Sequence, residues 1–286
     1  MEASLQFLVS GLVIGTIYGL AAIAYTTIFN VTGVINFAQG DMVMFPALVA
    51  IAGFDMGLGY AGAVGCALVA GGLLGAVVDV AVVARLRGSV LRTTIATIGL
   101  GIVLQGVAVL VFGTEAQTLP GPLADRQFRV FGASLPGSSL VVLATAAVLV
   151  GGLALLFQAS FIGRAFRACA INPYAARLSS IDIAAMRRLA FVLSGVISAV
   201  IGVIVAPITL MQYDTGIAIG IKGFVACIIG GLGNPLGALL GGLFLGVVES
   251  FATGLVGSGY KSAVAFILLI AMLLLRPGGL LGRGAA

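Results

Sequence analysis

Residues 5–29 read LQFLVSGLVIGTIYGLAAIAYTTIF, a long apolar run that contains no charged side chain. About 20 apolar residues in a helix are enough to cross the hydrocarbon core of a bilayer, and this run is longer than that. The four residues before it, Met-Glu-Ala-Ser, lack the basic start of a secretory signal. The stretch therefore predicts a retained membrane-spanning helix.

The composition of the whole chain agrees with this interpretation. Hydrophobic residues make up 61% of the 286 residues, charged residues only 8%, and the mean hydropathy is +1.25. Soluble domains carry about 25% charged residues, so this chain lacks the side chains for an ordinary water-facing surface. A membrane β-barrel would alternate apolar and polar residues, whereas the runs at 141–157 and 264–275 are continuously apolar. We expect an all-α polytopic membrane protein.

Similar apolar runs predict the remaining spans. A Gly-rich apolar region at 217–252 breaks at the sequence GGLGNP, residues 230–235. We expect eight or nine transmembrane or re-entrant helical segments and a single membrane domain over residues 1–286. The other spans are predicted near 42–54, 60–84, 93–112, 139–158, 189–212 and 260–275.

Basic residues gather at three places and predict the orientation. Cytoplasmic loops of membrane proteins carry an excess of Lys and Arg. Here 10 of the 14 basic residues lie near 85–92, in the loop 159–188 and in the C-terminal tail. We therefore expect these three segments in the cytoplasm, and the N-terminus and the loop 113–138 outside. The region 217–252 must then cross twice or re-enter.

The loop 159–188 contains the signature of a short surface helix. Asn172 is a preferred N-cap residue, and Pro173 suits the first helical position, where its missing N–H costs nothing. A helix over 174–178 that presents the small residues Ala175 and Ala176 would fit a groove on a cytoplasmic partner. A basic loop lying on lipid headgroups is the alternative. Asp182 is placed to cap the helix that follows.

Two interruptions of the apolar pattern indicate a transport path. The sequence NFAQGD at 36–41 breaks the first half of the chain, and GGLGNP at 230–235 breaks the second. Broken membrane helices in corresponding positions of two halves are typical of substrate paths in transporters. We expect the two breaks to lie together around one cavity, and Asp41 to cap the helix that begins after the first break.

Polar residues within apolar segments are further candidates, because ionisable groups in membrane helices are costly and often functional. Asp79 precedes Arg85 by about a turn and a half, so we expect a structural ion pair or a snorkelling arrangement there. Hydrogen bonds between helices explain most of the other polar residues equally well. The candidates for lining a translocation path are Asn36, Gln39, Gln105, Gln212 and Glu249.

Several function classes are disfavoured by what the sequence lacks. Histidine is absent, and Cys66, Cys169 and Cys227 have neither metal-ligand nor disulfide spacing, so we expect no metal site. No Gly-x-x-x-x-Gly-Lys-Ser/Thr phosphate loop occurs, so we do not expect this chain to hydrolyse ATP. A water channel is disfavoured because the first of two Asn-Pro pairs, at 172–173, lies in the most basic loop. An ion-coupled carrier is a further alternative.

Four segments, in order along nearly the whole chain, resemble one known family. The sequences GRAFRA at 163–168, NP at 172–173 and AARL at 175–178 resemble the coupling loop of ATP-driven importers, and more narrowly that of branched-chain (hydrophobic) amino acid permeases. Residues 11–18 with INFAQGD at 35–41, the segment 224–242, and RPGGL at 276–280 with Gly282 resemble other parts of that family. The one departure is Ser180-Ile181, where the family commonly has Gly-Ile.

The resemblance implies a permease subunit, not an enzyme, of an ABC importer in the bacterial inner membrane that works by alternating access. It implies a second homologous permease in a heterodimer, two cytoplasmic ATPases that hold ATP and Mg²⁺, a periplasmic solute-binding protein and membrane lipid, but no nucleic acid. This chain itself would bind no cofactor. The implied solutes are branched-chain or other hydrophobic amino acids, with urea, amides and aromatic acids as alternatives. The residues implied to couple the permease to the ATPases are Gly163, Arg164, Arg167, Asn172, Pro173, Ala175, Ala176, Arg177 and Leu178.

Overall fold

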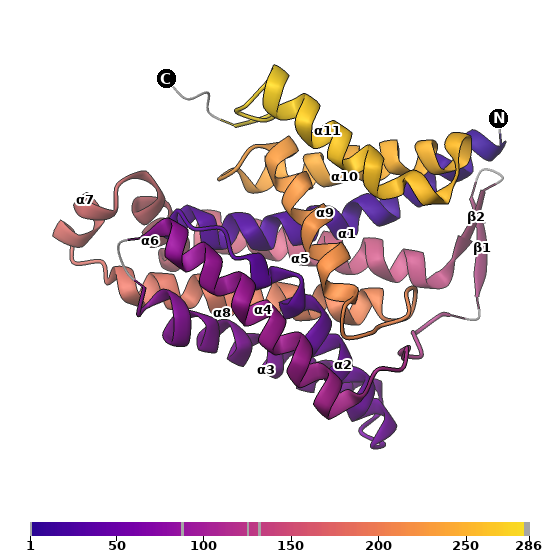
Figure 1. The fold of residues 1–286 in the computed structure, drawn as a ribbon, viewed down its shortest axis with the longest axis horizontal. Coiled ribbons are helices and arrows are strands. Elements are labelled where there is room, and N and C mark those ends of the chain that lie inside the picture. The colour runs from indigo at the N-terminus through magenta and orange to yellow at the C-terminus, as the bar shows by residue number, and fades with distance from the viewer. Residues whose placement is uncertain (1, 87–88, 125, 131–132, 283–286) are drawn as a thin grey trace.

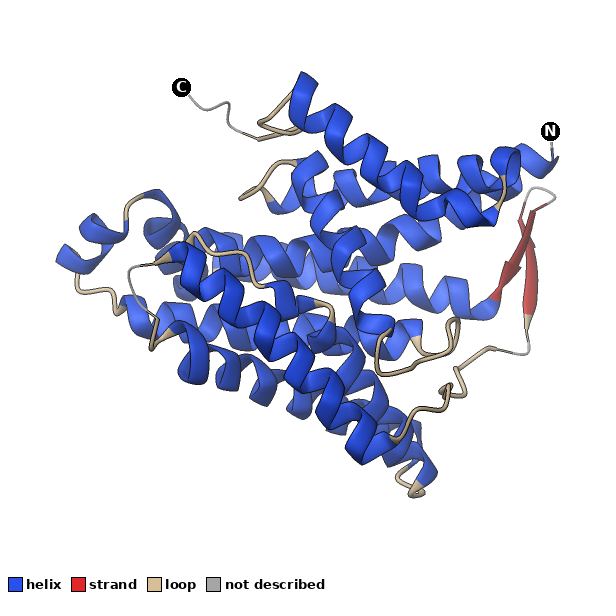
Figure 2. Ribbon diagram, in the orientation of Figure 1, coloured by secondary structure: helices blue, strands red, loops and turns tan. Residues whose placement is uncertain are grey.

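The computed structural model describes residues 2–86, 89–124, 126–130 and 133–282, and most of them are helical (Figures 1 and 2). In chain order the elements are α1 (Glu2–Thr32), the 3-10 turn η1 (Phe37–Gln39), α2 (Asp41–Asp55), α3 (Gly59–Val78), the π-helical turn η2 (Asp79–Val83), α4 (Val90–Phe112), β1 (Gln127–Val130), β2 (Ala133–Pro136), α5 (Gly137–Ala159), α6 (Phe161–Ile171), α7 (Pro173–Leu178), α8 (Ile183–Val205), α9 (Thr215–Gly230), α10 (Pro235–Val256), the 3-10 turn η3 (Ser258–Tyr260) and α11 (Lys261–Leu275).

The predicted fold class is confirmed. Within the described residues, seven helices are long and apolar enough to cross a membrane, and α9 and α11 are shorter apolar helices. The break predicted at 230–235 falls between α9 and α10. One span differs from the expected 189–212, because Asp182 caps the start of α8 at Ile183 and the helix ends at Val205. Pro207 follows two residues later and cannot continue a helix.

The molecule has two distinct ends (Figure 1). At one end lie α6 and α7, where Val31 of α1 packs with Phe166 and Cys169 of α6. At the other end lies the antiparallel β1–β2 hairpin, which was not expected from the sequence. Gln6 of α1 joins this hairpin through two hydrogen bonds with the backbone of Ser134, of 3.0 and 3.1 Å. We call these the basic end and the hairpin end, and α1 extends from one to the other.

The three basic segments lie toward the basic end (Figure 1). Arg187 at the start of α8 contacts Asp79, which directly follows α3 and precedes the first basic loop. The tail after α11 returns to the start of α10, where Asn234 Nδ2 donates a hydrogen bond to the carbonyl of Leu281 (3.0 Å). Positive-inside loops on one side of a membrane require this grouping.

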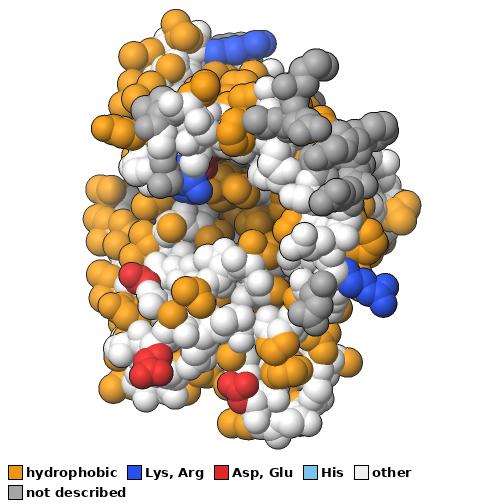
Figure 3. All heavy atoms as spheres, turned by 90° about the vertical axis from the view of Figure 1, so that its right-hand side faces the viewer, with side chains coloured by type: hydrophobic (Ala, Val, Ile, Leu, Met, Phe, Trp, Pro, Cys, Tyr) orange, Lys and Arg blue, Asp and Glu red, His pale blue; other side chains and the backbone are white. Residues whose placement is uncertain are grey.

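Three helices form the centre of the bundle. About two thirds or more of the apolar stretch of α1, α2 and α8 is buried, whereas less than a quarter of that of α4 and α5 is. The outer helices turn large apolar side chains outward, among them Leu110 of α4 and Val148 of α5. Viewed from the hairpin end, hydrophobic side chains cover much of the surface (Figure 3). This distribution suits a protein whose solvent is lipid.

Glycines allow a close contact between α1 and α10. Gly15 and Gly19 of α1 face Gly242 and Gly246 of α10. A Cβ atom added to Gly242 would lie only 2.2 Å from the backbone nitrogen of Gly19. Small residues of this kind let membrane helices pack backbone against backbone, so α1 and α10 form one tightly joined pair.

Candidate functional site

The predicted surface helix is present at the basic end. The Oδ1 atom of Asn172 accepts the backbone N–H groups of Tyr174 (3.0 Å) and Ala175 (3.1 Å), and Pro173 occupies the first position of α7. The N-cap and the proline predicted from the sequence are therefore confirmed. Such a cap stabilises a helix by about 1 kcal/mol, and it fixes the point at which the chain turns from α6 into α7.

A left-handed residue ends this short helix. Ser180 has φ of +60°, the N–H of Ile181 donates to the carbonyl of Ala176 (3.1 Å), and the N–H of Ser180 donates to that of Arg177 (3.1 Å). This pair of hydrogen bonds is the Schellman motif, whose left-handed position strongly favours glycine. Ser180, which stands where the resembled family commonly has glycine, is thus the one residue of the turn at which glycine has a physical advantage.

The two small residues of α7 do not share an exposed face, which corrects the sequence expectation. Ala176 is buried with Phe166, Cys169 and Ala190, because α7 folds back onto α6 and α8. The same burial raises the pKa of the Cys169 thiol. Ala175 is exposed. The outward surface near it is apolar, since Ile171, Tyr174 and Leu178 are each more than 70% exposed.

The other residues implied to couple divide into two groups. Three of them stabilise the turn from α5 into α6: the Gly163 N–H donates to Ser160 Oγ (2.9 Å), the Arg164 guanidinium lies 5.5 Å from the centre of the Phe161 ring, and Arg167 Nη1 donates to the carbonyl of Phe157 (2.5 Å). Arg177 and Leu178, by contrast, point outward from α7.

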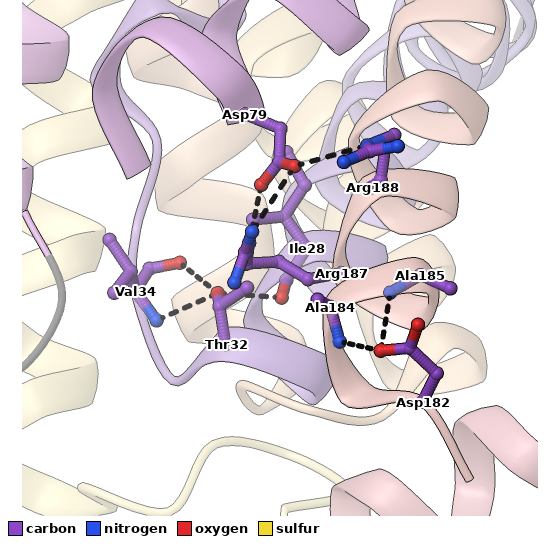
Figure 4. Close-up of polar contacts among 9 residues, drawn as sticks. All are labelled: Ile28, Thr32, Val34, Asp79, Asp182, Ala184, Ala185, Arg187 and Arg188. Atoms are coloured by element: carbon purple, nitrogen blue, oxygen red, sulfur yellow. Dashed lines mark hydrogen bonds and ion pairs between the residues drawn. The ribbon is translucent and has the colours of Figure 1, made fainter. Parts of the chain in front are cut away.

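A buried ion pair joins α3 to α8 directly behind this loop (Figure 4). Arg187 Nε lies 2.5 Å from Asp79 Oδ1, and Arg188 Nε lies 3.9 Å from Asp79 Oδ2. Asp79 is fully buried. The expected ion pair is therefore present, but Asp79 is paired with Arg187 of α8 instead of the neighbouring Arg85.

At the start of α8, Asp182 Oδ1 accepts the N–H groups of Ala184 (2.8 Å) and Ala185 (3.2 Å), which confirms the predicted cap.

The break at 36–41 is held by a buried polar cluster. Gln39 Nε2 donates to Ser198 Oγ (2.5 Å), and Gln39 Oε1 accepts from Ser194 Oγ (3.1 Å) and from Asn36 Nδ2 (3.4 Å). Asn36 and Gln39 are each only 1% exposed. The sequence indicated both side chains but not their serine partners, because α8 lies more than 150 residues further along the chain.

Asp41 does not cap α2, which corrects a second expectation. Gly40 occupies the N-cap position, and Asp41 is already the first helical residue. Its Oδ1 accepts a hydrogen bond from Gln105 Nε2 of α4 (2.9 Å), so Gln105, which is partly exposed, lies beside the break. Gly40 also packs against the first turn of α9, since a Cβ on Gly216 would lie 2.6 Å from the Gly40 carbonyl.

The two breaks pack against different parts of the chain, and the expectation that they surround one cavity stays a prediction. The segment 231–234 lies at the basic end, where the backbone of Gly231 packs against the tail at Gly279 and Gly282. The first break contacts the start of α9, in addition to α4 and α8. The last candidate in that region, Gln212, lies in the loop before α9, and its backbone N–H is bonded to Thr215 Oγ1 (2.9 Å).

Glu249 belongs to a separate cluster between α1, α9 and α10. Lys222 Nζ lies 2.5 Å from Glu249 Oε1 and 3.0 Å from the hydroxyl of Tyr18. The sequence analysis missed Lys222, although a lone lysine within the apolar region 217–252 is itself a sign of a functional or paired group. Of the path candidates, then, Asn36, Gln39 and Gln105 lie around the first break, whereas Glu249 lies apart from them.

Comparison with known proteins places the chain in a family. Residues 7–273 match the family model of the branched-chain amino acid transport system permease component. The chain is 34% identical to the high-affinity branched-chain amino acid transport system permease protein BraD of Pseudomonas aeruginosa and 32% identical to LivH of Escherichia coli, in each case over 98% of this chain and 96% of the relative. It is 30% identical to a probable branched-chain amino acid transport permease, LivH, of Methanocaldococcus jannaschii, over 92% of this chain and 88% of the relative. The chain is a multi-pass membrane protein that belongs to the family of branched-chain amino acid transport permeases.

Proposed function

We propose that this chain is the permease subunit of an ATP-driven importer and forms the path for branched-chain or similar hydrophobic amino acids by alternating access. The family membership and the names of the relatives support the solute class. The observation that carries the coupling role is α7, a capped helix at the extreme basic end (Figure 1), whose outward side chains include the apolar Tyr174 and Leu178 beside Arg177. Exposed apolar side chains on a short helix suit a groove in a partner protein.

The proposal includes the remaining parts of the importer. A second homologous permease would pair with this chain, which forms a single permease domain of its own. Two cytoplasmic ATPases would hold ATP and Mg²⁺ and contact α7, and a periplasmic binding protein would deliver the solute. The chain itself would bind no cofactor. The grouping of the basic segments supports an inner-membrane orientation with the loop 159–188 and the C-terminus in the cytoplasm and the N-terminus in the periplasm.

In this proposal, movement of α7 is transmitted to the membrane helices through contacts behind it. Ala176 packs on α6 and α8, and Arg187 of α8 holds Asp79 at the end of α3. The path would pass the break at 36–41, where Gln105 and Gln212 are partly exposed. Asn36 and Gln39 would hold the shape of the break from behind, because their side chains are bonded and buried.

The experiment is uptake in cells that lack the chromosomal copy of this gene. A plasmid copy should restore uptake of radiolabelled leucine and valine, and depletion of ATP should abolish it. The variant Ala175→Arg should remain in the membrane but lose uptake, because a long charged side chain at an exposed position obstructs docking without disturbing the loop. Ala116→Arg, at an exposed position after α4, is the control and should transport normally.

Two outcomes would contradict this proposal. Normal uptake by Ala175→Arg would remove α7 from the coupling surface. Restoration of urea, acetamide or benzoate uptake, with none of leucine, would replace the solute class.

A further inference from the structure

A small cavity lies between α1, α10 and α11, toward the hairpin end. Its volume is about 220 Å³, and Phe7 and Ile14 of α1 contribute apolar walls. Ser10 of α1 and Thr253 of α10 also line it, and the Thr253 hydroxyl donates to the carbonyl of Glu249 (2.8 Å). The surface at this end is hollowed, with hydrophobic walls and basic and acidic side chains at its edge (Figure 3). Pockets for drug-sized ligands measure about 300–1,000 Å³, so this one suits a smaller solute.

Glu249 supplies an unsatisfied acceptor to this cavity. It is 2% exposed and lines the cavity. Its Oε1 atom accepts from Lys222, but Oε2 is buried and has no hydrogen-bond partner among the residues that the structure describes. An unpaired buried acceptor costs about 1–3 kcal/mol, and more when it is charged. A ligand with an N–H donor would remove that cost.

Lys261 brings a positive charge to the same cavity. It is the first residue of α11 and is partly buried among the lining residues. Because Lys222 balances the charge of Glu249, Lys261 adds an excess positive charge among the lining residues that the structure describes. A carboxylate would compensate this charge, and the hydroxyl group of Ser10 in the lining is a further hydrogen-bond donor for it.

We propose that this cavity binds a zwitterionic α-amino acid with an apolar side chain. The ammonium group donates to Glu249 Oε2, the carboxylate lies toward Lys261, and the side chain packs on Phe7 and Ile14. The inference rests on the proposed function, since it assigns the solute of the importer a contact site in the permease itself. Because the cavity lies toward the hairpin end, it receives the solute before the break at 36–41 does.

The test is equilibrium binding of radiolabelled leucine to the full-length chain in lipid nanodiscs. Two competitors each lack one charged group: 3-methylbutylamine has no carboxylate and 4-methylpentanoate has no ammonium. We expect each to compete at least tenfold more weakly than unlabelled leucine. Lys261→Gln and Glu249→Gln should each lower the affinity for leucine at least tenfold. Arg126→Gln, which removes an exposed charge at the hairpin end outside the cavity, should leave it unchanged.

The variants separate binding from folding. Glu249→Gln leaves Lys222 without its counter-charge and can unfold the chain, whereas Lys261→Gln and Ser10→Ala alter only partly buried positions. Leucine affinity unchanged in both Lys261→Gln and Ser10→Ala would overturn the inference. Absence of leucine binding to the wild-type chain would do so too, while leucine uptake by intact cells would still support the proposed function. Absence of uptake in the wild type would instead contradict the function itself.

Discussion

Arg187 Nε lies 2.5 Å from Asp79 Oδ1, and this contact joins residues 108 positions apart in the chain. Asp79 begins the π-helical turn after α3, and Arg187 lies in the first turns of α8, directly after the loop that carries α7. The ion pair is therefore a direct polar connection between the end of α3 and the helix that follows the surface loop. Its removal should affect both the stability of the bundle and the coupling of transport to ATP.

Replacing Asp79 with Asn should destabilise the protein by about 3 kcal/mol, because it leaves the mostly buried Arg187 charge without a partner. The double variant Asp79→Asn/Arg187→Met should recover part of this loss, since it removes both charges. Arg188→Ala is the control, and because the Arg188 side chain is 60% exposed it should cost less than about 1 kcal/mol. Thermal unfolding in detergent measures all three. Equal losses for Arg188→Ala and Asp79→Asn would contradict this ranking.

Replacing Ser180 with Gly should stabilise the loop by up to about 1 kcal/mol, because glycine adopts the left-handed conformation without steric cost. Ser180→Val should destabilise it by a larger amount, since a β-branched side chain disfavours φ of +60°. Hydrogen exchange at the amides of Ser180 and Ile181 reports on both changes. Faster exchange in the glycine variant than in the wild type would contradict the assignment of this turn.

Replacing Gln39 with Leu should reduce the yield of folded protein more than the uptake per folded molecule. The change leaves the hydroxyl groups of Ser194 and Ser198 without the amide that they contact, at a cost of about 1–3 kcal/mol. Yield and uptake are measured on the same preparation, with Gln105→Leu for comparison at a partly exposed position. Full yield with lost uptake would place Gln39 in the path itself.

Replacing Gly242 with Ala should separate α1 from α10, because the added Cβ would collide with the backbone of Gly19. We expect a loss of at least about 2 kcal/mol, as for overpacked cores. Gly151→Ala in α5 is the matched control: nothing lies within 4 Å of its Cβ position, so alanine should add stability of up to about 1 kcal/mol through its helix propensity. Thermal unfolding of the two variants should give opposite signs.

Cysteines introduced at Ser134 and Ser179 should react with a membrane-impermeant maleimide from opposite sides of the membrane. The first lies in the hairpin and the second at the end of α7, in a chain whose native cysteines are replaced by alanine. Labelling of both introduced cysteines from one side would overturn the orientation.

The wild-type Cys169 thiol should react slowly with a maleimide at pH 7 and faster as the pH rises, because burial raises its pKa and so lowers the thiolate fraction.

Local signals in the sequence predicted much of the fold. Asn172 with Pro173, and Asp182 before α8, act through residues two or three positions away, so their roles as caps follow from short-range geometry. The apolar runs likewise placed the membrane helices. The predicted end of α8 was less accurate. The residues up to Gln212 are as apolar as the helix, and only Pro207 indicates where the helix ends.

Long-range partners could not be predicted from such signals. Asp79 has a nearer arginine in the sequence at position 85, and only the packing of α3 on α8 selects Arg187. In the same way, the prediction that the two helix breaks lie together rested only on their similar composition. The packing of Gly40 on Gly216 instead brings the first break to the start of α9.

The length of α1 has a consequence for the membrane around this protein. Its apolar run at 5–29 would extend about 37 Å as a helix, whereas the hydrocarbon core is about 30 Å thick. Because α1 is joined along its length to α10, the two helices must tilt together, or the surrounding lipid must thicken. Lipids with longer acyl chains would let the pair stand more upright, so the thickness of the bilayer is itself a variable that acts on this transporter.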